Sequence, residues 1–124
     1  MATAAPRPPT IAAPPLAPTG EAVDFAHLAR MTLGERELER EVLALFEQQA
    51  GMLLARMRGG DRAAAVCAAH TLKGSARSIG AWQVALAAEA VELSDAATRT
   101  GAIEALSGAI AAARIAIARR LSAN

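Results

Sequence analysis

The sequence is poor in cysteine and in aromatic residues, and each shortage excludes something. Cys67 is the only cysteine, so the chain has no internal disulfide, and a free thiol fits a reducing compartment. We expect Cys67 to pack as a small hydrophobic residue. With one Trp, two Phe and no Tyr, any core must be built mainly from small aliphatic side chains. No second cysteine, histidine pair or carboxylate cluster has the spacing of metal ligands, so no metal site is expected.

The sequence also lacks an excess of charge of either sign. Thirteen Lys and Arg residues are nearly balanced by twelve Asp and Glu residues, which gives a net charge of +1. Proteins that bind the phosphate backbone of nucleic acids normally carry a basic excess, so no nucleic-acid partner is expected. We find no run of about 18 strongly apolar residues, so we expect no membrane-spanning helix and a cytoplasmic protein.

Proline is absent after residue 20, because all six prolines lie within residues 1–20. Proline interrupts helices and removes backbone donors, so this Pro/Ala-rich segment is predicted to be a disordered tail. A tether or a proline-rich partner-binding segment is the alternative. The prolines also break up any apolar core of a secretory signal. Residues 21–124 are predicted to form one helical domain.

From residue 21 onward, apolar residues recur at spacings of three and four, which is typical of amphipathic helices. Helices are predicted at 23–30, 35–58, 61–80, 81–98 and 103–121. Four long helices with short connections predict an all-α fold, an antiparallel up-down four-helix bundle with a short extra N-terminal helix.

Two of these helices carry specific expectations about which side chains face inward. On 35–58 the expected inward residues are Leu38, Val42, Leu45, Phe46, Gln49, Met52, Leu53 and Met57. On 81–98 they are Ala81, Val84, Ala88, Val91 and Asp95.

The most informative stretch lies in the middle of the predicted helix 61–80. His70, Lys73, Gly74 and Arg77 are three, four and seven positions apart and so share one helix face. The apolar stripe lies elsewhere, at Ala65, Ala69, Leu72, Ala76 and Ile79, so His70 is expected to point away from the core. Glycine costs about 1 kcal/mol relative to Ala in a helix interior, so Gly74 indicates close approach of another surface. Lys73 is the only lysine of the chain and places a compact cation one turn from the imidazole.

The signature of histidine-containing phosphotransfer (HPt) domains closely resembles this stretch, which reads His70-Thr71-Leu72-Lys73-Gly74-Ser75-Ala76 and then Ile79-Gly80-Ala81. The resemblance extends over about residues 23–121. It implies a four-helix bundle that relays phosphoryl groups in bacterial, fungal or plant two-component systems. It further implies that His70 accepts a phosphoryl group from a receiver-domain aspartate and passes it to another. The implied partners are receiver domains of response regulators and of hybrid histidine kinases.

The resemblance also implies roles for the neighbours of His70. Glu92, 22 positions after the histidine, would accept the Nδ1 proton and leave Nε2 as the attacking atom; the alternative is an ordinary surface carboxylate. Lys73 would stabilise the charge of the phosphoryl group. Arg77 would contact either the phosphoryl group or the receiver. Gly74 and Ser75 would keep the surface open for docking.

No magnesium-binding carboxylate cluster and no nucleotide-binding loop are recognised in the sequence, so we expect a phosphoryl carrier without its own ATP site. No cofactor is expected on this chain, and the partner receiver would supply Mg²⁺ and most of the catalysis. A monomer is expected. Two alternatives stay open: a phosphatase helper that does not retain phosphate on His70, and a non-phosphorylated helical adaptor that binds a receiver.

Overall fold

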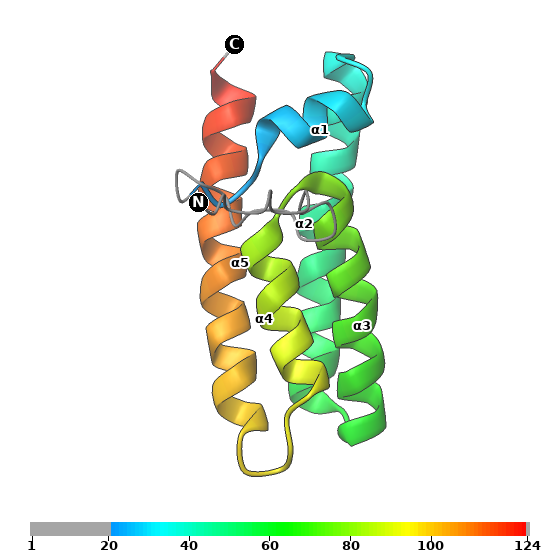
Figure 1. Cartoon of the computed structure of the whole chain (residues 1–124), viewed down its shortest axis with the longest axis vertical. Coiled ribbons are helices and arrows are strands. Elements are labelled where there is room, and N and C mark those ends of the chain that lie inside the picture. Colours follow the sequence, from blue (N-terminus) through cyan, green and yellow to red (C-terminus); the bar gives the residue numbers. More distant parts are fainter. Residues whose placement is uncertain (1–20, 124) are drawn as a thin grey trace, which may run out of the picture.

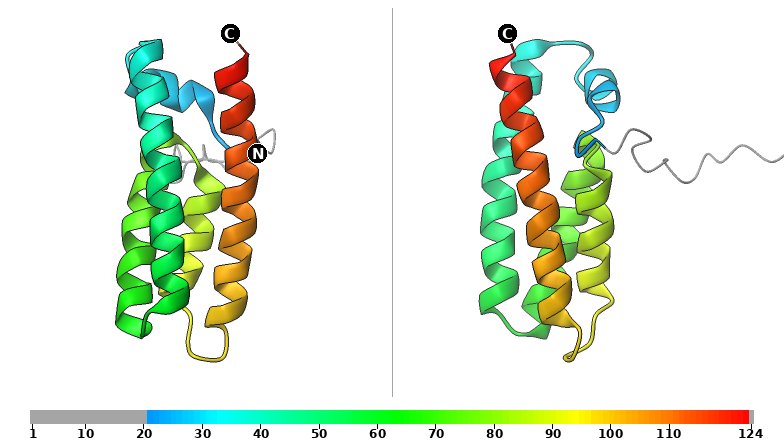
Figure 2. Two further views of the ribbon diagram at one scale, coloured as in Figure 1. Left: turned by 180° about the vertical axis from the view of Figure 1, so that it is seen from behind. Right: turned by 90° about the vertical axis from the view of Figure 1, so that its left-hand side faces the viewer.

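The computed structural model describes residues 21–123, which form five helices without a strand (Figure 1). The helices are α1 (Phe25–Met31), α2 (Arg36–Gly59), α3 (Arg62–Ile79), α4 (Trp82–Glu92) and α5 (Arg99–Ser122). The four long helices α2 to α5 run alternately up and down, and α1 lies across one end of them (Figure 2). The predicted all-α bundle with a short extra N-terminal helix is therefore confirmed. The tail predicted at 1–20 lies outside the described residues.

Helix boundaries near the site follow from local chemistry. Asp61 begins α3, because its Oδ1 accepts the backbone N–H of Ala64 at 2.9 Å. Gly80 ends α3 with a φ of +81°, a left-handed conformation that favours glycine. A Cβ on Gly80 would lie 2.8 Å from the carbonyl oxygen of Asp24, and the Asp24 N–H donates to the Gly80 carbonyl at 2.8 Å. Gly80 thus lets the segment before α1 lie directly against the end of α3.

The predicted boundary between the last two helices is wrong by several residues. The helix expected at 81–98 ends at Glu92, and the helix expected to begin at residue 103 begins at Arg99. The Asp95 carboxylate accepts the backbone N–H of Thr98 at 2.9 Å, and the Asp95 N–H donates to the Thr98 hydroxyl at 3.0 Å. These local bonds compete with helical ones and hold a turn. Asp95 is exposed, so its expected inward position is also wrong.

On α2 the expected inward face is confirmed in part, for Phe46, Leu53 and Met57, and is wrong for three other residues. Leu43, Phe46, Ala50, Leu53, Leu54 and Met57 are buried, whereas Leu38, Leu45 and Met52 are exposed. The helix carries two apolar rows, and its packing against both α3 and α5 covers only one of them. Cys67, expected to pack as a core residue, is exposed on α3.

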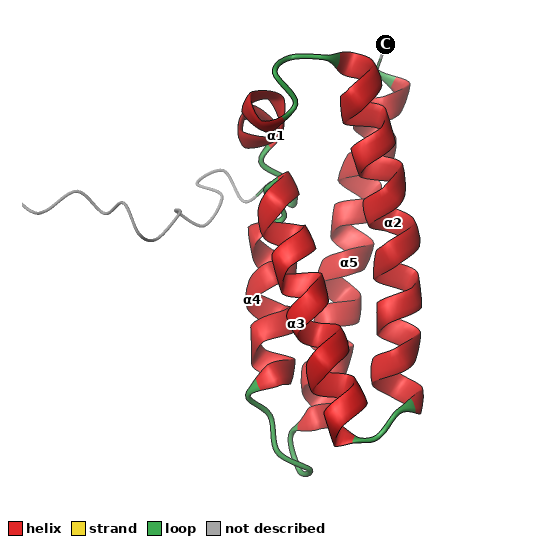
Figure 3. Ribbon diagram, turned by 90° about the vertical axis from the view of Figure 1, so that its right-hand side faces the viewer, coloured by secondary structure: helices red, strands yellow, loops and turns green. Residues whose placement is uncertain are grey.

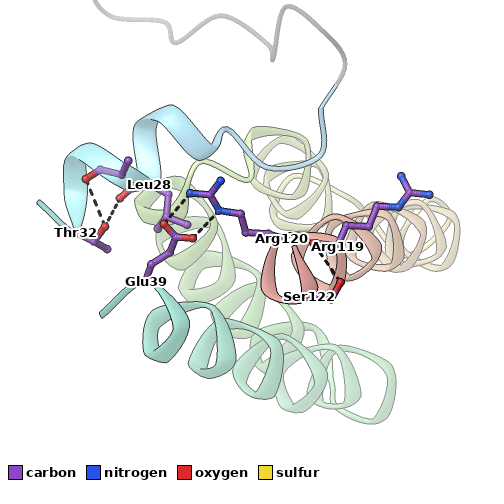
Figure 4. A network of polar contacts seen from close by, with 7 residues as sticks. Leu28, Thr32, Glu39, Arg119, Arg120 and Ser122 are labelled. Carbon is purple, nitrogen blue, oxygen red and sulfur yellow. Dashed lines mark hydrogen bonds and ion pairs between the residues drawn. The ribbon is translucent and has the colours of Figure 1, made fainter. Parts of the chain in front are cut away.

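One charged pair joins α2 and α5 beneath α1 (Figure 4). Glu39 is buried, and its carboxylate accepts hydrogen bonds from Arg120 Nε at 2.7 Å and Nη2 at 3.2 Å. These bonds hold the pKa of Glu39 below its usual value, although burial opposes them. The Arg120 guanidinium also lies 5.0 Å from the centre of the Phe25 ring on α1. Three helices therefore meet at this pair.

The last helix, α5, is long and apolar enough to cross a membrane by length and composition alone, contrary to the sequence expectation. Its most apolar 18-residue window has a mean hydropathy of 1.5. A mostly buried core helix also passes this test; 28% of the window is buried here, and Ile103, Leu106, Ile110 and Ile117 of α5 lie in the core. The composition of α5 is therefore weak evidence for a membrane span.

Candidate functional site

His70 projects from the middle of α3 into solvent, and its side chain is 71% exposed. The core stripe of α3, which includes Ala69, Leu72 and Ala76, is buried on another side. α3 and α4 pack side by side (Figure 3), which brings Glu92, the last residue of α4, next to the histidine. The distance from His70 Nδ1 to Glu92 Oε2 is 2.8 Å. An ionised carboxylate only accepts hydrogen bonds, so Nδ1 is the donor, and in a neutral ring the lone pair is then on Nε2.

Lys73 lies against the same carboxylate rather than free in solvent. Its Nζ is 2.6 Å from Glu92 Oε1, and the two side chains are each 15% exposed. Lys73 and, to a lesser degree, His70 hold the pKa of Glu92 below its usual value, although burial opposes them. Glu92 is therefore ionised at neutral pH. Its position at the C-terminus of α4 is unfavourable for a negative charge, and the Lys73 ammonium offsets this.

The other predicted site residues are close to His70 in sequence but outside this cluster. Gly74 is exposed, and a Cβ built on it would have no neighbouring atom within 4 Å, so the surface beside His70 is open. Arg77 is exposed, and no ion pair of its guanidinium is found among residues 21–123. Ser75 turns toward α2, where its hydroxyl donates to Gln49 Oε1 at 2.7 Å. The structure thus brings His70, Lys73 and Glu92 into one cluster and sets the remaining three apart from it.

Sequence reasoning missed the surface that α2 contributes beside the site. Two shallow hollows of about 150 and 320 Å³ lie between α2 and α3, and a third of about 340 Å³ is lined by α2 alone. Gln49 lines all three, with exposed Leu45 and Met52 on either side of it along α2. The sequence does carry a signal for this surface, because the polar Gln49 interrupts the apolar row of Leu45 and Met52.

Metal ligands do not gather in the part of the chain that the structure describes. Among residues 21–123, no group of three or more His, Cys, Asp or Glu side chains is placed to hold a metal ion. His70 and Glu92 form a pair without a third ligand of this kind.

A family model described as "Hpt domain" matches residues 41–122, which is more than half of the chain. This chain belongs to the Hpt domain family. Its fold and sequence are also similar to those of the histidine phosphotransferase ShpA from Caulobacter crescentus, known from a crystal structure. The identity is 33%, the TM-score is 0.63, and the match covers 81% of this chain and 90% of that chain. No curated protein matches the sequence.

Membership of the Hpt family confirms the resemblance that the signature around His70 indicated. Hpt domain proteins are phosphocarriers of phosphorelays rather than classical enzymes, and they interact with receiver domains. This chain is accordingly a phosphorelay Hpt protein. The family model begins within α2, so α1 lies outside the match. The N-cap residue of α1, Asp24, donates to Gly80, and Phe25 of α1 packs against Arg120.

Proposed function

We propose that this Hpt protein carries a phosphoryl group on Nε2 of His70, which it accepts from an aspartyl phosphate of one receiver and passes to an aspartate of another. The observation that supports this most directly is an exposed imidazole whose Nδ1 lies 2.8 Å from the Glu92 carboxylate. In the first step the Nε2 lone pair attacks phosphorus in line, the P–N bond forms, the P–O bond to the aspartate breaks, and the aspartate leaves as a carboxylate.

Glu92 acts as the positioning residue of this step. Its hydrogen bond keeps the proton on Nδ1 and turns the ring so that Nε2 faces solvent. Positive charge develops on the ring as Nε2 attacks, and the adjacent carboxylate stabilises it. When a second aspartate attacks phosphorus, the P–N bond breaks and the electron pair returns to Nε2.

Lys73 acts in both states of the carrier. In the unphosphorylated protein it neutralises Glu92, since its Nζ lies 2.6 Å from Oε1. The ammonium stands on a flexible chain one helical turn from His70, so it turns to the phosphoryl oxygens once they arrive. Phosphoryl transfer depends on such charge neutralisation and on positioning.

Docking of the receiver uses the open surface around His70. Gly74 allows close approach, Ser75 borders the groove toward α2, and Arg77 supplies a cation that contacts either the phosphoryl group or the receiver. The receiver brings Mg²⁺ and most of the catalysis, while this chain binds no cofactor. We propose that the carrier is a cytoplasmic monomer.

Transfer from radiolabelled receiver domains of the source organism tests the proposal. Wild type and His70→Gln are incubated in parallel with each phosphorylated receiver, and label on this chain is followed with time. We expect label on wild type only, lost in acid and stable in base, as a phosphoramidate should be. A labelled His70→Gln variant would contradict the assignment of the acceptor.

Loss of receiver label without labelling of this chain would indicate the phosphatase helper instead. Binding without any movement of label would indicate the adaptor. A chase with a second, unlabelled receiver then tests whether phosphorylated His70 passes the group onward.

A further inference from the structure

The groove between α2 and α3 is lined by apolar side chains and by polar ones, which include Arg56, Thr71 and Ser78, and Gln49 is the polar residue that lines both of its hollows. Gln49 lies between Leu45 and Met52 along α2, and these two are 64% and 50% exposed. The groove begins beside the open surface at Gly74, because Ser75 lines the same hollow as Gln49. A receiver that approaches His70 closely therefore covers Gln49 as well.

The amide of Gln49 is held by one hydrogen bond. Its Oε1 accepts the Ser75 hydroxyl at 2.7 Å, which directs the Nε2 group, with two N–H donors, away from Ser75. No partner for Nε2 is found among residues 21–123, and Nε2 is not among their buried polar atoms without a partner. The donors are therefore open to solvent in the free protein and are available to a docked surface.

We propose that the Gln49 amide, held by Ser75, is the hydrogen-bond donor by which this chain selects among receiver domains. The preferred receiver presents an apolar face to Leu45 and Met52, with one acceptor oxygen opposite Gln49 Nε2. A receiver with an apolar group or a donor at that point displaces water from the amide without accepting a hydrogen bond. The free-energy cost of leaving the buried N–H groups unpaired with such a receiver exceeds the net gain from one hydrogen bond with the preferred receiver. This inference rests on the proposed function, since it concerns the partners of the same site.

The test compares phosphotransfer kinetics across the receiver panel for wild type, Gln49→Met, Gln49→Glu and Ser75→Ala. Methionine keeps the length of the side chain and removes the donors, and glutamate keeps its shape but replaces the donors by acceptors. Gln83→Met makes the same chemical change at an exposed residue of α4 that lines none of these hollows, and it serves as the matched control.

For the preferred receiver we expect Gln49→Met to raise KM about tenfold, which is about 1.4 kcal/mol of binding free energy, with kcat unchanged. The KM for the other receivers should change by less than about twofold, so the difference in KM between the preferred receiver and the others becomes smaller. Gln49→Glu should raise the KM for the preferred receiver further, and Ser75→Ala should raise it less. Gln83→Met should leave the ranking of receivers unchanged. The Tm of all four variants should resemble that of wild type, because each substituted residue is half-buried or exposed.

An equal loss for every receiver, no loss for any, or the same loss in Gln83→Met would overturn the inference. A fall in kcat with KM unchanged would also overturn it, because it would place Gln49 in the transfer step rather than in docking. If wild type accepts label from no receiver, the proposed function fails and this inference fails with it. If wild type transfers normally and Gln49→Met keeps the same ranking, this inference alone fails.

Discussion

The contact between Lys73 and Glu92 makes a quantitative prediction, which a double-mutant cycle tests. The four proteins are wild type, Lys73→Met, Glu92→Gln and the double variant. Removing one partner of a fully buried ion pair costs about 3–5 kcal/mol, whereas an exposed pair contributes about 0–1 kcal/mol. Both side chains are 15% exposed, so the pair lies between these limits. We therefore expect a coupling free energy of about 1–2 kcal/mol.

The pH dependence of this coupling has a definite sign. The pKa of Glu92 is lowered from its ordinary value of 4.5, first by the hydrogen bond from Lys73. A group whose folded pKa is depressed stabilises the protein above its unfolded pKa and loses that contribution as the pH falls through the folded pKa. The coupling should accordingly be complete at pH 7 and should diminish once the pH falls below 4.5 and through the folded pKa of Glu92.

Urea unfolding followed by helical circular dichroism at several pH values measures the cycle. A loss of about 1 kcal/mol in Lys73→Met corresponds to about 4–8 °C in Tm for a domain of this size. Arg77→Met is the matched control, because it removes an exposed cation one turn further along α3. Its cycle with Glu92→Gln should be additive within about 0.5 kcal/mol. Additivity in the Lys73 cycle, or a coupling that does not change with pH, would refute the ion pair.

Three further variants test other parts of the structure. Arg120→Met leaves the buried Glu39 carboxylate unpaired. Because Arg120 is 32% exposed, the loss should lie below that of a fully buried pair, at about 1–3 kcal/mol by urea unfolding; addition of Glu39→Gln should recover part of the loss, and no recovery would contradict the pairing. Gly80 has a φ of +81° and lies against the Asp24 carbonyl, so Gly80→Ala should lower the free energy of unfolding by about 1–3 kcal/mol. It should also speed amide hydrogen exchange in α1, and unchanged exchange would argue against the close approach. Gly74→Gln should block receiver binding, measured by titration, with little change in Tm; unimpaired binding would refute the role of the open surface.

The sequence predicted the site helix well because its signals agree with one another. On α3 an N-capping Asp61, a single apolar stripe and a terminal Gly80 all favour the same helix in the same orientation. The outward position of His70 follows from that stripe alone. The proximity of Glu92 does not, because it depends on how far α3 and α4 overlap, and only the resemblance to a family indicated it.

Predictions failed where one pattern allowed two structures. α2 carries the row of Leu38, Leu45 and Met52 beside the row of Leu43 and Ala50, and periodicity does not tell which row its neighbours cover. The end of α4 depends on short side-chain bonds that a helical pattern does not register. Tertiary contacts determine which row of α2 is buried, and local hydrogen bonds determine where α4 ends. Neither kind of interaction can be inferred from the spacing of apolar residues.

The exposed position of Cys67 gives the chain a natural attachment point for a spectroscopic reporter. The thiol lies three residues before His70 on α3 and lines the hollow that also contains Met52 and Thr71. Because no other cysteine competes for the reagent, a maleimide dye would label this one place without any substitution. A docked receiver would change the polarity around such a dye, so its fluorescence would report association in real time on the native sequence.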